Sequence, residues 1–195
     1  YFTGTTKLDS GVSVSITVQL EADRGSGGII DESYMKLTGG FGDLRLGSTT
    51  GTNSVLKHTA PYVGVSADGG GSDNYITVPA AVTAANSTNA ASSGDANKIA
   101  YISPRQGGLA MGFSYTPSTT NADVSPTTGG NDGDRAEVLE AALSFETTMG
   151  TSSVQADIGV EQVSNNTQKY RGGLKVSAGG VTVGGSISKQ NDQNL

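Results

Sequence analysis

Two short motifs in this chain match the serine, lysine and amide pattern of an acyl-transfer site. Ser54 and Lys57 form an S-x-x-K motif, and Ser72, Asp73 and Asn74 form an S-D-N motif. Enzymes that use this pair attack a carbonyl with the serine, and they need a K-T-G strand later in the chain to complete the site. No K-T-G follows here, and both matches lie in one stretch rich in Gly and Ser. The motifs therefore do not predict an enzyme.

Side chains that could hold a metal ion or cleave a sugar are sparse as well. His58 is the only histidine, so neither a His cluster for zinc nor a Ser-His triad can form within this chain. Asp132 and Asp134 resemble the carboxylates of a calcium-binding turn, although a single copy is more typical of a solvated loop. Asp157 and Glu161 could mimic the acid pair of a glycosidase, but a polar strand face carries such residues by default. We expect no resident metal and no cofactor.

The elements that must position these side chains are short segments in which apolar and polar residues alternate. Between residues 12 and 21, the apolar set is Val12, Val14, Ile16, Val18 and Leu20, and the polar residues lie between them. Such alternation predicts β-strands with one apolar and one polar face. About ten segments of this kind follow one another, which indicates an all-β chain. They cover residues 1–7, 12–21, 30–38, 44–46, 98–103, 109–116, 136–146, 154–161, 169–177 and 181–189.

The connections between these segments favour a membrane barrel over a soluble sandwich. Tight turns and long polar loops alternate along the chain, as expected when the two rims of a barrel face different compartments. Hydrophobic residues make up only 34% of the chain, which is low for a domain that must bury a thick core. We therefore predict a transmembrane antiparallel β-barrel.

Charge and composition exclude one class of partner. The net charge is −6, and the 12 Lys and Arg residues are scattered, so no basic cluster could neutralise successive phosphates of a nucleic acid. The chain contains no cysteine.

An extracellular β-rich adhesin or surface-layer domain would share this acidic, cysteine-free composition and is the alternative to a barrel. Strict alternation of turns and loops, with one long insertion after Leu46, favours the barrel.

Three stretches of the sequence resemble the Gram-negative general porins, particularly the alphaproteobacterial type. They are residues 31–48 (DESYMKLTGGFGDLRLGS), 58–61 (HTAP) and 97–105 (NKIAYISPR). The resemblance implies a homotrimer of barrels with about 16 strands each in the outer membrane of a Gram-negative bacterium. Such barrels are water-filled channels for the passive diffusion of ions and small hydrophilic solutes. Their partners are the outer-membrane lipid and those solutes.

The resemblance also gives a place to the long connection between residues 48 and 97. A connection of this length is far beyond an ordinary loop. In the porins the third external loop folds inward and narrows the pore, and residues 48–97 occupy its position. Residues 1–195 would then form a single porin barrel domain that is incomplete at both ends, from about the second strand to near the eleventh.

A constricted pore needs opposed charges, because carboxylates on the loop and cations on the wall create a field across the opening that orients polar solutes. Asp68 and Asp73 are the candidates on the loop. The candidates on the wall are basic residues whose strand positions match the polar face: Lys7, Lys36, Arg45, Arg171 and Lys175.

Overall fold

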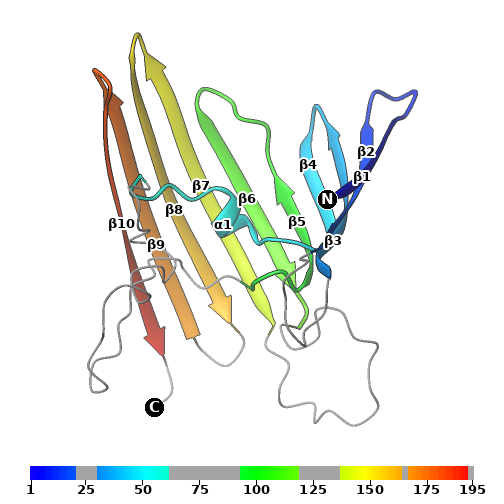
Figure 1. The fold of residues 1–195 in the computed structure, drawn as a ribbon. Helices are drawn as coiled ribbons and strands as arrows, with labels where there is room; N and C mark the ends of the chain where they lie inside the picture. The colour runs from blue at the N-terminus through cyan, green and yellow to red at the C-terminus, as the bar shows by residue number, and fades with distance from the viewer. Residues whose placement is uncertain (21–29, 62–92, 119–136, 164–166, 193–195) are drawn as a thin grey trace.

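The computed structural model describes five stretches of the chain, which form one antiparallel β-sheet with a short helix on one side (Figure 1). The described residues are 1–20, 30–61, 93–118, 137–163 and 167–192. Ten strands follow one another across the sheet in sequence order, which confirms the predicted all-β, antiparallel architecture. Their bounds are β1 Phe2–Lys7, β2 Ser13–Leu20, β3 Ile30–Gly39, β4 Gly42–Ser48, β5 Asn97–Ile102, β6 Leu109–Thr116, β7 Val138–Met149, β8 Ser152–Val163, β9 Thr167–Ala178 and β10 Val181–Asp192, and the helix is α1 Thr52–Val55.

Tight turns join the strands of each hairpin at one end of the sheet (Figure 1). The β9–β10 hairpin shows how a turn sets the register. Ala178 pairs with Val181, so only Gly179 and Gly180 form the loop, with φ angles of 58° and 81°. A two-residue hairpin in which both φ angles are positive matches the twist of the strands, and glycine adopts it without strain.

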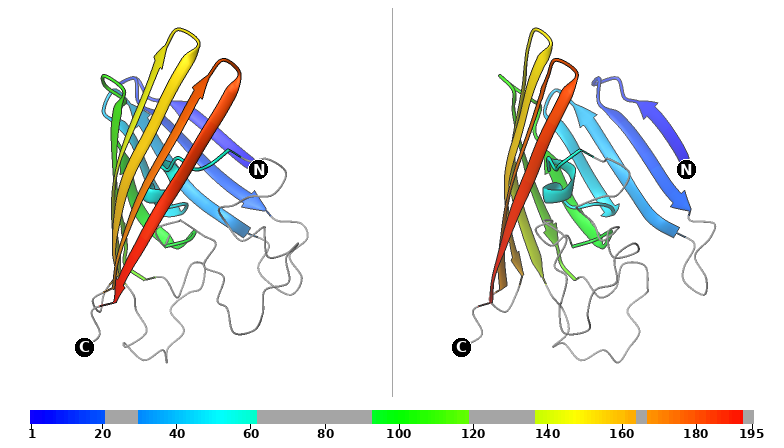
Figure 2. Two further views of the ribbon diagram at one scale, coloured as in Figure 1. Left: turned by 90° about the vertical axis from the view of Figure 1, so that its left-hand side faces the viewer. Right: turned by 60° about the vertical axis from the view of Figure 1, so that its left-hand side comes forward.

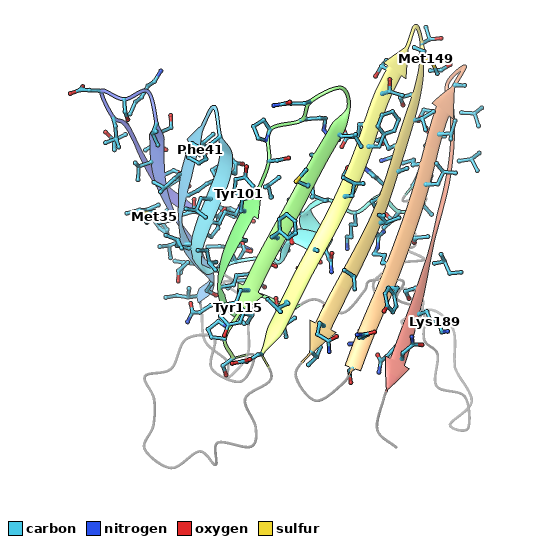
Figure 3. The ribbon with its side chains drawn as sticks, turned by 180° about the vertical axis from the view of Figure 1, so that it is seen from behind. Met35, Phe41, Tyr101, Tyr115, Met149 and Lys189 are labelled. Carbon is cyan, nitrogen blue, oxygen red and sulfur yellow. The ribbon has the colours of Figure 1, made fainter. Side chains whose placement is uncertain are left out.

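The register gives the sheet an apolar and a polar face. Ile16 stands directly opposite Met35, and directly opposed residues of antiparallel strands point to the same side. On the apolar face Ile16, Phe113 and Leu174 are 57%, 53% and 52% exposed. Figure 3 shows this face and labels Met35 and Tyr101 on it. Large apolar side chains exposed along a whole sheet are typical of strands that contact lipid.

The sheet is curved, and α1 lies on its concave side (Figure 2). This side is the polar face, and α1 contacts strands β5 to β8 there. A small apolar cluster of Leu56, Ala110 and Ala142, with Ile102 packed against it, lies at this contact. Strands β1 and β10 are the two edges and do not pair with each other, so the described strands do not close a barrel.

The described parts of the chain contain no helix of the length and apolar character needed to cross a membrane.

Candidate functional site

The polar face carries the five basic residues that the sequence suggested for a pore wall. Lys36 stands opposite Ser15 on β2 and opposite Arg45 on β4. The pairing continued across the sheet from β1 to β9 places the other three on the same face: Lys7, Arg171 and Lys175. The structure therefore puts all five on one surface, although they differ in burial and in partners.

Lys36 and Arg45 form a pair of adjacent cations. They are directly opposed on β3 and β4, and both are half-buried. Neither forms an ion pair with any residue that the structure describes. Like charges that face each other across two strands destabilise a sheet. The pair thus leaves positive charge on the polar face that is not neutralised by the wall itself.

Residues 49–61, which we call the inner segment, cross the polar face after β4 (Figure 2). The segment begins at an acidic cluster, where Thr50 donates to Glu32 Oε1 from its backbone nitrogen at 2.9 Å and from its hydroxyl at 2.8 Å. The Thr50 hydroxyl also lies 3.3 Å from Asp95 Oδ1. Burial, together with the nearby carboxylates of Glu32 and Asp31, raises the pKa of Asp95.

Glu140 on β7 holds both ends of the long connection. Its Oε2 accepts hydrogen bonds from the Asn53 backbone nitrogen at 3.1 Å and from the Ser114 hydroxyl at 3.0 Å. Its Oε1 accepts one from the Ser93 hydroxyl at 3.0 Å. Asn53 lies near the start of the connection and Ser93 near its end, so one buried carboxylate fixes both to the wall.

Lys98 on β5, which lies on the same polar face, also ties these two ends together. Its buried ammonium donates to the carbonyl oxygens of Thr49, Gly94 and Ala96, at 2.8 Å for Gly94 and 2.7 Å for Ala96. An ammonium has three protons to donate, and the three carbonyls accept all of them. Lys98 is therefore a structural cation rather than a charge that faces a solute.

The far end of the inner segment is fixed at His58. The Asp157 carboxylate accepts a hydrogen bond from the His58 backbone nitrogen at 2.5 Å, and Arg171 Nη2 donates to the His58 carbonyl oxygen at 2.7 Å. Asp157 and Arg171 are also bound to each other as an ion pair. The imidazole Nε2 lies 3.0 Å from the Ser144 hydroxyl, which indicates a hydrogen bond between them.

Glycines on the wall make room for this path. A Cβ atom on Gly112 would lie 2.8 Å from Thr52 Cβ, one on Gly159 would lie 2.6 Å from Asn53 Oδ1, and one on Gly173 would overlap the His58 carbonyl oxygen. Real Cβ atoms essentially never lie within 3.0 Å of another heavy atom in this way, so a side chain at these positions would force a neighbour to shift. These glycines interrupt β6, β8 and β9 where another stretch of backbone approaches the sheet, a known use of glycine in strands.

The comparison with known families decides what this architecture is. The family model described as Gram-negative porin matches residues 1–195, the whole chain.

The chain belongs to the Gram-negative porins.

Two solved structures are similar to this porin. One is the anion-selective porin from Comamonas acidovorans, with 19% sequence identity and a TM-score of 0.45; the alignment covers 98% of this chain and 68% of that one. The other is a porin refined at 1.8 Å resolution, with 16% identity and a TM-score of 0.28, covering 99% of this chain and 86% of that one. No curated protein matches significantly.

Membership of this family places the porin in the outer membrane of a Gram-negative bacterium, as an antiparallel β-barrel through which solutes diffuse passively. The exposed apolar face is then the side that contacts lipid, and the polar face is the side that lines the lumen. The predictions of family, fold class, location and channel function are confirmed.

The other candidates from the sequence are placed as follows. Asp68, Asp73, Asp132 and Asp134 lie outside the described residues, so the structure gives them no position. Ser54 lies in α1 and Lys57 follows it, while the S-D-N motif that would complete the site is not described. Asp157 is engaged by Arg171 and His58, and Glu161 is buried beneath the lumen surface. Within the parts of the chain that are described, no group of three or more metal-ligating side chains comes together.

Sequence reasoning missed Glu140, Lys98 and the wall glycines, which position the inner segment. Only the glycines left a signal. A glycine inside a strand pattern suggests that backbone or ligand approaches closely, and Gly112, Gly159 and Gly173 each interrupt an alternating segment. Glu140 and Lys98 have polar-face positions like many other lumen residues, so their special role depends on contacts with the inner segment.

Acidification is expected to loosen the inner segment at His58. Burial lowers the pKa of the imidazole below 6.5, although Asp157 and Glu146 raise it in part; Lys175 and Arg105 lower it further. A histidine with a lowered pKa in the folded state binds protons more readily when unfolded, so its contribution to stability is present above pH 6.5 and is lost as the pH falls through the lowered pKa. Urea unfolding in vesicles between pH 7.5 and 5 should show stability falling more steeply in the wild type than in His58→Gln. Equal slopes would contradict this assignment.

Proposed function

We propose that residues 48–97 form the loop that narrows this porin's pore, and that ions and small hydrophilic solutes pass between that loop and the wall that carries Lys7, Lys36 and Arg45. The observation that carries the proposal is the inner segment itself. Residues 49–61 lie on the concave, polar face and are fixed there by Glu140, Asp157 and Arg171. An inner segment that is fixed on this face occupies part of the lumen cross-section.

The charges of the wall support a field across the opening. Lys36 and Arg45 contribute adjacent positive charges that no described carboxylate neutralises. Lys7 and Lys175 point to the same face, whereas Arg171 lies beneath His58 with its charge paired to Asp157. Lys7, Lys36 and Arg45 are therefore stronger candidates for the cationic side than Arg171. Asp68 and Asp73 are our candidates for the acidic side.

The proposal extends to assembly and chemistry. We infer that residues 1–195 belong to a single porin domain, that the complete porin is a homotrimer, and that it is a channel and not an enzyme, with no cofactor. The position of Ser54 supports the inference that the porin is not an enzyme. Ser54 belongs to α1, and this helix packs on strands of the lumen wall. The native mass of the detergent-solubilised full-length porin tests the trimer.

Reversal potentials test the pore charges. In a planar bilayer with a salt gradient, Lys36→Gln/Arg45→Gln should move the reversal potential of the full-length porin toward cation preference, because two positive charges leave the ion path. Asp68→Asn/Asp73→Asn should move it in the opposite direction. Both shifts should shrink as salt rises, since the screening length falls from about 30 Å at 0.01 M to about 3 Å at 1 M. Unchanged potentials in either double variant would remove those residues from the constriction.

A further inference from the structure

The basic residues of the described strands lie on the polar face of the sheet, with one exception. Of the Lys and Arg side chains in the described strands, Lys189 alone has a register position on the apolar face. Lys189 stands opposite Tyr170, and Tyr170 stands opposite Val160, so the three point the same way. Figure 3 shows Lys189 on the side of the sheet that also carries Met35.

The position of Lys189 along its strand lets its charge reach the lipid headgroups. β10 ends at Asp192, three residues beyond, which is about 10 Å at about 3.4 Å per residue. A lysine on the lipid side of a barrel costs roughly 2 to 4 kcal/mol at the bilayer midplane but about 0 to 1 kcal/mol near the interface. Its long stem allows the ammonium to extend toward the polar rim. The side chain is exposed and forms no ion pair with a described residue.

An apolar groove lies beside Tyr170 on the same face. It has a volume of about 560 Å³ and is walled by Met111, Phe113, Leu143, Ile158 and Tyr170. Ala141, which stands between Phe113 and Val160 in the register, contributes only a methyl group and so leaves space in the groove. Tyr170 thus lies between a hydrocarbon-lined groove and a cation that forms no ion pair with a described residue.

We propose that Lys189 and this groove bind one anionic membrane lipid, with its phosphate at the Lys189 ammonium and an acyl chain in the groove. The positive charge of Lys189 favours an anionic headgroup. The apolar lining of the groove favours a hydrocarbon chain, because contact with the chain keeps both surfaces out of water. Tyr170 adds an aromatic ring between the two parts, where such rings prefer the boundary of headgroups and chains. A second copy of the chain fits less well, because contact there would bury the lysine charge without a partner.

Native mass spectrometry of the full-length porin in detergent tests the site, with phosphatidylglycerol as the anionic probe and phosphatidylcholine as the uncharged one. The wild type should retain phosphatidylglycerol at lower lipid concentration than phosphatidylcholine. Lys189→Gln should weaken phosphatidylglycerol binding about fivefold, which corresponds to about 1 kcal/mol for one cation near an anionic membrane surface. Lys189→Arg should keep the preference, and phosphatidylcholine binding should not change.

Two further variants separate this site from general charge and packing effects. Lys169→Gln removes the same charge one residue from Tyr170 but on the polar face, and it should leave phosphatidylglycerol binding unchanged. Ala141→Leu fills the groove and should weaken both lipids. Equal losses in Lys189→Gln and Lys169→Gln, or no loss in Lys189→Gln, would overturn the proposal. Single-channel conductance should stay at the wild-type value in Lys189→Gln, so this result does not depend on the proposed constriction.

Discussion

The Gly173→Ala porin is expected to unfold at lower urea concentration than the wild type and to show an altered single-channel conductance. The new Cβ atom would overlap the His58 carbonyl oxygen and crowd Asp157 Oδ1. Neither can move freely, because Arg171 binds both of them. Overpacking of this kind costs about 1 to 3 kcal/mol. Relief of the overlap requires the inner segment to leave the wall, which changes the open cross-section of the lumen.

The neighbouring glycine provides a matched control for this prediction. A Cβ atom on Gly172 would point to the apolar face and find its nearest neighbours at 3.7 and 4.0 Å, which are ordinary contacts. Gly172→Ala should therefore leave stability and conductance close to the wild type. Gly184 and Gly185 repeat the contrast on β10, since a Cβ atom would lie 3.0 Å from the Thr59 carbonyl oxygen at Gly184 and meet nothing within 4 Å at Gly185. Equal effects at Gly172 and Gly173 would contradict the described seat of the inner segment.

The second large effect is expected at the buried ion pair. Asp157→Asn should lower the free energy of unfolding by about 3 to 5 kcal/mol, because it leaves the Arg171 charge buried without a counterion. The two side chains are 3% and 1% exposed, so water cannot replace the lost carboxylate. Asparagine still offers an oxygen to the His58 backbone nitrogen, which isolates the loss of charge. Urea titration in lipid vesicles measures the change.

The exposed pair of Arg105 and Glu146 is the control. Their side chains are 32% and 37% exposed and 2.7 Å apart, and exposed pairs of this kind contribute about 0 to 1 kcal/mol. Glu146→Gln should therefore have a small effect. Removing both charges in Asp157→Asn/Arg171→Met should cost less than Asp157→Asn alone, because no buried charge then remains unpaired. A cost for Asp157→Asn no larger than that for Glu146→Gln would argue against a buried pair.

The strands were predictable because the two faces of the sheet lie in different environments. Apolar and polar residues therefore alternate along each strand. Each segment predicted from alternation overlaps one observed strand, and the register confirms that Ile16 and Thr17 point to opposite faces. The ends were less predictable. Alternation ends near Glu146, yet β7 continues to Met149, because its last residues pair with the start of β8 at Ser152. Pairing with a neighbour extends a hairpin even where the side chains carry no pattern.

The candidate site was predictable in outline but not in detail. Alternation assigned Lys36, Arg45 and Arg171 to the polar face, and their register positions agree. It could not show that Arg171 is covered by His58, since their contact joins positions more than a hundred residues apart. Such a contact depends on the path of the inner segment. That path follows the wall positions where glycine leaves room for a second stretch of backbone. The roles of Asp68 and Asp73 remain predictions.

The joining of both ends of the long connection at Glu140 and Lys98 has an evolutionary consequence. Thr49 and Asn53 enter, and Ser93 and Gly94 return, at the same place on the wall. The two ends of the connection are therefore held together by residues of the wall strands. Doubling the length of such a closed loop costs only about 0.6 kcal/mol. Residues 62–92 can then differ in length and sequence between related porins while Glu140 and Lys98 still hold the two ends of the connection together.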